Sequence, residues 1–175
     1  MSAWPSERAR HGGADEIPVP GGGGRLWLCG KHFIGPDPEA ALHRVGATGA
    51  VCLSEAAELV DRYPGYVSWL RANQPARALW YPVPDLHAPD LEDAVDLLDE
   101  LRSRLSSGQS LLMHCGAGIG RAGTIAAGLL ITMGLSLPDA EARVRAHRPM
   151  AGAEAGAQTE LLEALAARSA PRSGA

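Results

Sequence analysis

Short apolar runs alternate along the chain with stretches of helical periodicity. Four of these runs contain no Asp, Glu, Lys or Arg, which is typical of strands buried on both faces. They are predicted as β-strands and occupy residues 26–29, 49–53, 78–83 and 110–114.

The clearest helical pattern lies between the third and fourth runs. Leu91, Val95, Leu98, Leu101 and Leu105 recur at spacings of three and four residues, which places them on one helix face. Further helices are predicted over residues 38–45, 122–133, 138–145 and 158–167, and residues 54–75 are interpreted as mixed helix and loop.

Strands that alternate with helices indicate an α/β fold. We expect a central, largely parallel sheet of about four to five strands, flanked by helices. In such sheets, ligands bind at the carboxyl ends of the strands. Loops that directly follow a predicted strand are therefore the first places to look for chemistry.

Composition changes at both ends of the chain. Residues 1–24 are polar and include four consecutive glycines, so they are predicted as a flexible N-terminal arm. Residues 169–175 form a short polar tail. One domain is expected over residues 25–168, without internal repeats.

Charge and hydropathy narrow the possible partners. The net charge of −4 gives no indication of nucleic acid or an anionic membrane as partner. The longest apolar stretch, residues 125–133, is shorter than the ~20 residues of a membrane-spanning helix. No signal peptide is recognised, so we expect a cytoplasmic protein, with a monomer as the default state.

The three cysteines, Cys29, Cys52 and Cys115, are too widely spaced for a zinc motif and fit a reducing compartment. No metal or cofactor is expected.

Candidate chemistry is concentrated after the fourth predicted strand, in His114-Cys115-Gly116-Ala117-Gly118-Ile119-Gly120-Arg121. The interposed glycines let successive backbone N–H groups point at one centre. The helix that begins near Arg121 adds its positive end, and the Arg121 guanidinium matches two phosphate oxygens. These donors favour the nucleophilic thiolate form of Cys115. The pattern predicts a phosphate site with a cysteine nucleophile.

Two other interpretations of this loop fit the sequence less well. A Walker A loop requires a lysine before Ser or Thr at the start of the helix, and the loop has none. A lone cysteine at a strand end is usually an inert core residue, but the spacing to Arg121 through three glycines is far more specific.

The stretch resembles the signature loop of the cysteine-based protein tyrosine phosphatases, His-Cys-x5-Arg, and the small size of the chain is similar to the dual-specificity branch. The resemblance implies a metal-independent phosphatase that acts through a cysteinyl-phosphate. Cys115 and Arg121 would be catalytic, residues Gly116, Ala117, Gly118, Ile119, Gly120 and Arg121 would bind phosphate, and His114 would support the loop.

A second segment, Val83 to Pro89, follows a predicted strand and resembles the general-acid loop of the same family, Asp-x3-Pro. A leaving alkoxide or phenolate needs a positioned acid to protonate it. Asp85 is the candidate acid. Asp90 is the alternative, although it better suits the N-cap of the following helix.

A third segment runs from Arg148 to Gln158. The resemblance implies that Gln158 positions the water that hydrolyses the cysteinyl-phosphate. The chain departs from the family pattern after Arg121, where Ala122 replaces the usual Ser or Thr. The absent hydroxyl predicts slower breakdown of the phosphoenzyme.

The leading hypothesis is a phosphatase of phosphotyrosine in proteins, with phosphoserine and phosphothreonine as further candidate substrates. Two alternatives remain: a phosphatase of a phosphoinositide or another small phosphate monoester, and a weakly active phosphate-recognition module. Oxidation is predicted to affect Cys115, with Cys52 on a neighbouring strand as a candidate disulfide partner.

Overall fold

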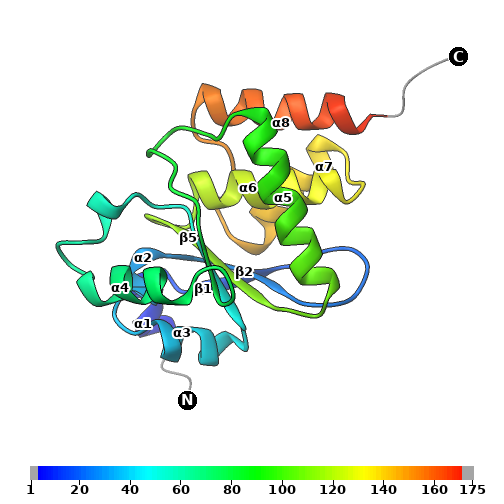
Figure 1. Ribbon diagram of the computed structural model, residues 1–175. Coiled ribbons are helices and arrows are strands. Elements are labelled where there is room, and N and C mark those ends of the chain that lie inside the picture. The colour runs from blue at the N-terminus through cyan, green and yellow to red at the C-terminus, as the bar shows by residue number, and fades with distance from the viewer. Residues whose placement is uncertain (1–3, 171–175) are drawn as a thin grey trace, which may run out of the picture.

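The computed structural model describes residues 4–170 of the chain, with side chains described from residue 8 onward. Five strands form one sheet in the order β1-β2-β5-β3-β4 (Figure 1). All neighbouring strands are parallel except β1 and β2. The predicted α/β fold with a largely parallel sheet is confirmed. The strands are β1 (Ala14–Ile17), β2 (Leu26–Gly30), β3 (Gly49–Cys52), β4 (Ala78–Trp80) and β5 (Leu111–Cys115).

The four predicted strands are all present, but the third is shorter than expected. β4 ends at Trp80, because Pro82 has no N–H to donate to a ladder. The chain nevertheless stays close to the sheet, since the N–H of Val83 donates to the carbonyl of Leu53 at 2.9 Å. This contact directs the segment after β4 toward the carboxyl ends of the strands.

The prediction of a flexible arm over residues 1–24 is wrong for residues 4–17. They form helix α1 (Trp4–His11) and strand β1, which pairs antiparallel with β2. Ala14 and Ile17 are buried on this edge strand. The strand is only four residues long and lies between glycines and a proline, so no periodicity in the sequence distinguishes it from a loop.

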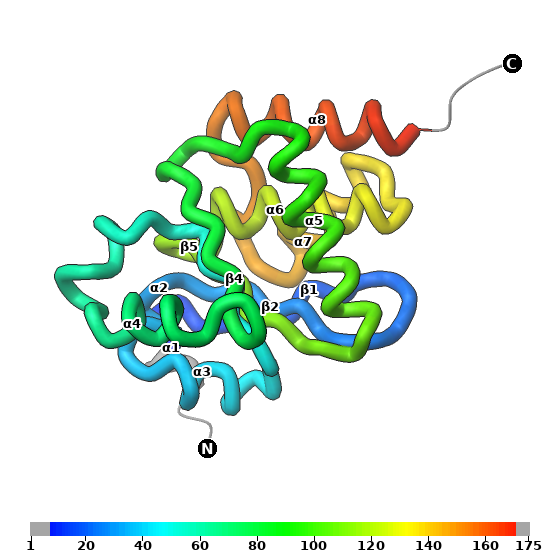
Figure 2. Tube along the Cα trace, viewed as in Figure 1, coloured from blue at the N-terminus to red at the C-terminus, as the bar shows by residue number. Residues whose placement is uncertain are grey.

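Helices cover both faces of the sheet (Figures 1 and 2). One face carries α5 (Leu91–Ser106), α6 (Gly120–Thr132), α7 (Leu137–His147) and α8 (Gly156–Ser169). The other face carries α2 (Lys31–Ile34), α3 (Pro38–Val45) and α4 (Pro64–Asn73), with a 3₁₀ turn η1 (Ala56–Glu58) between α3 and α4. Period-two alternation in the strands fills both cores: Leu111 and Met113 of β5 face the first, and Leu112 faces the second.

The predicted helices over 38–45, 91–105, 122–133, 138–145 and 158–167 are confirmed within about two residues at each end. The short helix α2 was not predicted, and α4 lies within the stretch interpreted as mixed. At α3, the Asp37 side chain accepts a hydrogen bond from the N–H of Ala40 at 3.0 Å, as an N-cap residue does.

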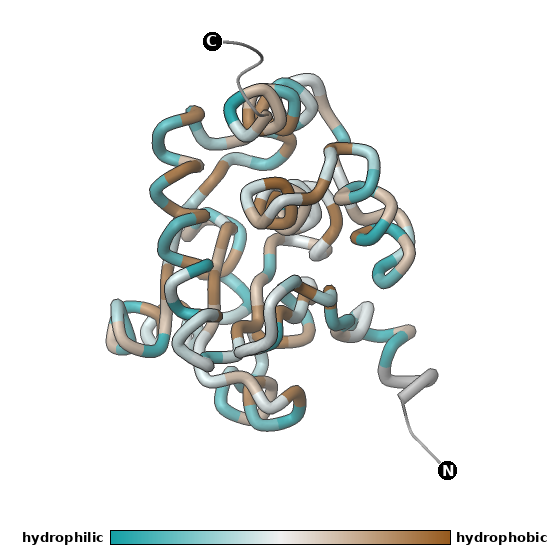
Figure 3. The backbone as a smooth tube through the Cα atoms, turned by 90° about the vertical axis from the view of Figure 1, so that its right-hand side faces the viewer, coloured by the Kyte–Doolittle hydropathy of each residue, from teal (hydrophilic) through white to brown (hydrophobic). Residues whose placement is uncertain are grey.

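Helix α6 is the central helix of the first core. Every residue from Gly120 to Ile131 is buried, so the helix is enclosed on all sides. Figure 3 shows hydrophobic segments grouped toward the centre of the molecule and hydrophilic ones at the outer turns. The fixed position of α6 places its N-terminus at the end of β5. Among the described residues, none of the helices has the length and hydropathy to span a membrane.

Candidate active site

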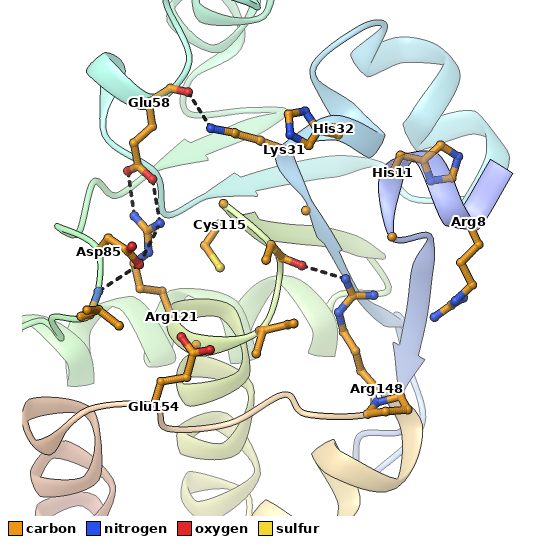
Figure 4. A pocket seen from close by; sticks show the side chains of 18 of the residues that line it. Arg8, His11, Lys31, His32, Glu58, Asp85, Cys115, Arg121, Arg148 and Glu154 are labelled. Atoms are coloured by element: carbon orange, nitrogen blue, oxygen red, sulfur yellow. Dashed lines mark hydrogen bonds and ion pairs between the residues drawn. The ribbon is translucent and has the colours of Figure 1, made fainter.

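The loop between β5 and α6 surrounds the candidate nucleophile. Cys115 is the last residue of β5 and Gly120 is the first of α6, so the turn between them is only four residues long. The side chain of Cys115 is 3 % exposed and lines a cavity of about 840 Å³. We call residues 114–121 the phosphate loop. The cavity lies at the carboxyl ends of the strands, where the fold class predicts a ligand site (Figure 4).

Close packing against β2 requires glycine at one position of this loop. Gly118 has φ +71°, in the left-handed region. A Cβ atom there would lie 2.2 Å from the carbonyl oxygen of Cys29. Any other residue would displace the loop from the strand.

Arg148 holds the phosphate loop through hydrogen bonds to two of its backbone carbonyls. Its Nε donates to the carbonyl of Gly118 at 2.8 Å and its Nη2 to the carbonyl of Ala117 at 2.9 Å, while Nη1 binds the Asp15 carboxylate at 2.7 Å. Because the N–H and C=O of a trans peptide point in opposite directions, the N–H groups of the next residues, Gly118 and Ile119, point away from Arg148. This orientation leaves them available to an anion on the other side of the loop.

Arg121 is held by a carboxylate that the sequence analysis did not identify. Its Nη1 and Nη2 donate to the two carboxylate oxygens of Glu58 at 2.8 and 2.7 Å, and Nη1 also donates to the carbonyl of Val83 at 2.8 Å. The guanidinium is buried, yet its Nε has no acceptor among the described residues. A ligand oxygen at this point would complete its hydrogen bonds.

The Glu58–Arg121 pair shifts the pKa of both groups. Burial raises the pKa of Glu58, but hydrogen bonds and the charges of Arg121 and Lys31 outweigh it and lower the value below normal. Burial lowers the pKa of Arg121, but its hydrogen bonds to Glu58 together with the negative charges around it outweigh burial and raise the value above normal. Both groups therefore stay charged over a wide pH range.

Glu58 belongs to η1, where it also closes a capping box with Glu55. The N–H of Glu55 donates to Glu58 Oε2 at 2.8 Å. A Glu-x-x-Glu spacing was visible in the sequence, but it signals only a turn start. Nothing local indicates that this turn lies beside Arg121.

His114 connects the phosphate loop to the second core. Its Nδ1 lies 3.1 Å from the carbonyl oxygen of Cys115, and its Nε2 lies 2.7 Å from the hydroxyl of Tyr66. Complete burial lowers the pKa of His114 to about 4, and the charge of Arg121 acts in the same direction. The imidazole is thus neutral at pH 7, with Nδ1–H donating and Nε2 accepting.

The candidate general acid lies on residues 83–89, which we call the acid loop and of which residues 84–87 are exposed. The Asp85 side chain is 71 % exposed, and its Oδ1 lies 3.5 Å from Arg121 Nη2. The next residue, Leu86, has φ +63° and donates its N–H to Asp85 Oδ1 at 3.0 Å. Asp85 lines the cavity. Asp90 occupies the N-cap position of α5 without a side-chain cap hydrogen bond.

Gln158, which the resemblance implies as the residue that positions the hydrolytic water, is not among the residues that line the cavity. It is fully buried, and both ends of its amide are bonded: Oε1 accepts from the N–H of Glu154 at 2.7 Å, and Nε2 donates to the carbonyl of His87 at 3.2 Å. Glu154 itself lines the cavity. Gln158 therefore links the acid loop to the segment that carries Glu154.

The residue after Arg121 is packed tightly. Ala122 is fully buried. Two positions on, Thr124 donates its hydroxyl to the carbonyl of Gly120 at 2.7 Å. That hydroxyl is committed to its own helix and does not replace the one absent at position 122.

The other two thiols, Cys29 and Cys52, are not among the residues that line the cavity. Burial raises the pKa of Cys29 far above its usual range and that of Cys52 to about 12. Both are buried on the strands that flank β5. Neither is a nucleophile at neutral pH.

Comparison with known proteins agrees with this geometry. Residues 36–173 match the family model described as "Swiss Army Knife protein, DSP-PTPase phosphatase domain". The chain belongs to this cysteine-based phosphatase family. No curated protein matches the sequence.

Solved structures show the same phosphatase fold. Tk-PTP in its active form is 28 % identical, with a TM-score of 0.64 over 87 % of this chain and 97 % of that one. The kinase-associated phosphatase with its catalytic cysteine replaced by serine has a TM-score of 0.68 at 21 % identity, over 82 % and 86 % of the two chains. PTPMT1 in complex with PI(5)P has a TM-score of 0.67 at 18 % identity, over 82 % and 91 %.

Proposed function

We propose that this phosphatase hydrolyses phosphotyrosine in proteins, with phosphoserine and phosphothreonine as further substrates, without a metal or cofactor. The observation that carries the proposal is the unpaired Nε–H of buried Arg121, which shares the cavity with Cys115 and the backbone of the phosphate loop. A phosphate in this loop would bring phosphorus to the cysteine sulfur.

In the first half-reaction, the Cys115 thiolate attacks phosphorus and the bond to the leaving oxygen breaks. The N–H groups of the phosphate loop and Arg121 stabilise the charge on the remaining phosphate oxygens. Asp85 gives its proton to the leaving oxygen, so that a neutral alcohol departs. The products are the alcohol, the Asp85 carboxylate and a cysteinyl-phosphate.

In the second half-reaction, water attacks the phosphorus of the cysteinyl-phosphate. The Asp85 carboxylate takes a proton from that water, and the sulfur leaves as thiolate. Gln158 acts here as a positioning residue: its amide holds the acid loop at His87 and the cavity-lining segment at Glu154. We place the reaction in the cytoplasm and in a monomer.

The test is a substrate panel with a metal chelator present: para-nitrophenyl phosphate, phosphotyrosine and phosphoserine peptides, and soluble inositol phosphates. We expect hydrolysis of para-nitrophenyl phosphate and of the phosphotyrosine peptides, and none by Cys115→Ser. Hydrolysis of inositol phosphates alone would overturn the protein-phosphatase proposal. Binding of phosphopeptides without turnover would instead indicate a recognition module.

A further inference from the structure

The cavity has two walls of opposite charge (Figure 4). Glu58, Asp85 and Glu154 line one side of Cys115. Figure 4 shows Arg8, His11, Lys31, His32 and Arg148 on the other side, and Arg10, in the same last turn of α1 as Arg8 and His11, also lines the cavity. We call these six residues the basic wall. A net charge of −4 for the whole chain conceals this wall, because the fold gathers basic residues from three separate segments.

Little of this positive charge is neutralised nearby. Arg8 and Arg148 share a single carboxylate, that of Asp15. In the described part of the chain, no ion pair joins Arg10 or Lys31 to a carboxylate, and the ammonium of Lys31 donates to the backbone carbonyl of Glu58 at 3.2 Å. The wall therefore carries an excess of positive charge.

His32 adds a neutral polar group to the wall. Its Nδ1 lies 2.6 Å from the hydroxyl of Tyr63. Partial burial lowers the pKa of His32, and the charges of Arg62 and Lys31 lower it further. His32 thus adds no positive charge to the wall at neutral pH.

Most of the basic wall lies outside the phosphate loop, whereas buried Arg148 bonds to that loop directly. Cys115 and Arg121 are buried, but Arg10 is exposed and Lys31 is half-buried, so this part of the wall lies nearer to solvent than the nucleophile. Five of its six residues precede residue 36, where the match to the family model begins. A cavity of about 840 Å³ also has the size of a site for a whole ligand rather than for one phosphate.

We propose that the basic wall binds a second anionic group of the substrate, beside the phosphate that is hydrolysed. The proposal rests on the proposed function and narrows its substrate class to phosphotyrosine peptides in which a neighbouring residue is acidic or phosphorylated. Arginine forks pair with carboxylates and phosphates, and a charged wall nearer to solvent also speeds encounter with an acidic peptide. The phosphate loop itself carries no basic residue between Cys115 and Arg121, so this wall supplies the added selectivity.

The experiment measures kcat/KM of the full chain on matched phosphotyrosine peptides with neutral, acidic or phosphoserine neighbours. Inositol monophosphate and bisphosphate serve as small-molecule substrates. The test variant is Arg10→Glu. The matched control is Arg102→Glu, which makes the same change in net charge at an exposed position of α5 outside this cavity. Hydrolysis of para-nitrophenyl phosphate reports the state of the catalytic machinery in each variant.

We expect the parent to prefer acidic or phosphorylated neighbours by about tenfold, the change that one charge-assisted hydrogen bond supplies. Arg10→Glu should remove most of this preference, and Arg102→Glu should keep it. Arg102→Glu should hydrolyse para-nitrophenyl phosphate like the parent, and Arg10→Glu should lose less on this substrate than on the acidic peptides. Added salt should weaken the preference.

Equal rates on all peptides by a parent that hydrolyses para-nitrophenyl phosphate would overturn the basic-wall proposal alone. The basic-wall proposal would also be overturned if Arg10→Glu kept the preference for acidic or phosphorylated neighbours. A parent that preferred inositol bisphosphate over the monophosphate, but showed no preference among the peptides, would overturn it as well. A parent that fails on para-nitrophenyl phosphate would overturn the proposed function itself.

Discussion

The phosphate loop and the acid loop line the same cavity but are held in different ways. Carbonyls of the phosphate loop accept hydrogen bonds from Arg148 and from the N–H of Lys31, and Cys115 and Arg121 are 3 % and 4 % exposed. The Asp85 side chain is 71 % exposed, and its nearest cation lies 3.5 Å away. The proposed nucleophile is preorganised by the core, whereas the proposed general acid is placed by a surface segment.

In the proposed mechanism, phosphate binding therefore depends on the phosphate loop, and proton transfer depends on the acid loop. A loop whose backbone is fixed by its neighbours needs no rearrangement to stabilise transition-state charge. A carboxyl on an exposed segment remains accessible to water and can serve as acid in one step and base in the next. Changes in the phosphate loop should therefore alter every substrate alike, and changes in the acid loop should depend on the leaving group.

The largest effect is expected at the centre of the phosphate loop. Cys115→Ser should abolish turnover, because the hydroxyl is a far weaker nucleophile, and should retain phosphate binding, because most donors are backbone N–H groups. An assay of product formation measures turnover, and isothermal titration calorimetry with phosphate measures binding. Cys52→Ala is the control and should stay active. Turnover by Cys115→Ser at the parental rate would contradict the assignment of Cys115 as the nucleophile.

In the acid loop, Asp85→Asn should lower kcat by ~10²–10⁴-fold on substrates with poor leaving groups, the usual contribution of a general acid. The loss should shrink for leaving groups that need no proton. A series of aryl phosphates of increasing leaving-group acidity measures this trend, with Asp90→Asn as the control. Equal losses across the series would make Asp85 a structural residue.

His114, which supports the phosphate loop, should also make the free energy of unfolding depend on pH. His114 binds a proton near pH 6.5 when unfolded but only near pH 4 when folded. Its contribution to the free energy of unfolding is complete above pH 6.5. As the pH falls toward 4, this contribution is lost, which lowers the free energy of unfolding by up to about 3 kcal/mol. Urea unfolding at several pH values measures the slope.

His114→Asn should flatten that slope between pH 6.5 and 5, whatever its effect on the stability at neutral pH. His43→Gln, at an exposed position of α3, should keep the slope of the parent. An unchanged slope in His114→Asn would assign the pH dependence to other groups.

Glu58 tests how strongly Arg121 depends on its partner. Glu58→Gln keeps the shape of the side chain but weakens two charge-assisted bonds, so we expect kcat/KM to fall about tenfold on every substrate. Glu39→Gln is a matched control, since Glu39 forms a similar two-point pair with Arg77 on the surface. A loss that varied with the leaving group would instead connect Glu58 to the acid loop.

The smallest effect is expected at Ala122. Without a hydroxyl beside the sulfur, the cysteinyl-phosphate should accumulate, and rapid mixing with para-nitrophenyl phosphate should show a burst near one product per site. Ala122→Ser should raise kcat several-fold and leave the burst rate unchanged. This gain in kcat corresponds to much less than the ~2.7–4 kcal/mol that a strong oxyanion donor contributes. No burst in the parent and no gain in the variant would show that Ala122 limits nothing.

The sequence by itself determined the α/β class, the strand predicted over residues 110–114, the helix after it and the phosphate loop between them. These features depend on contiguous residues: hydrophobic periodicity sets the elements, and glycines at short spacing set the turn. The same locality made Asp85 visible, because its loop directly follows a predicted strand. Where local signals were weak, as at α1 and β1, the prediction was wrong.

Only the tertiary structure decided which partners surround that loop. Glu58 lies 63 positions from Arg121, and Asp15 lies 133 positions from Arg148, yet both pairs form hydrogen bonds of 2.7–2.8 Å. The strand order brings these segments together, and no pattern within one element encodes which distant side chain will face it. The two oppositely charged walls of the cavity, like the enclosure of Gln158 behind it, exist only because the sheet places separate chain segments side by side.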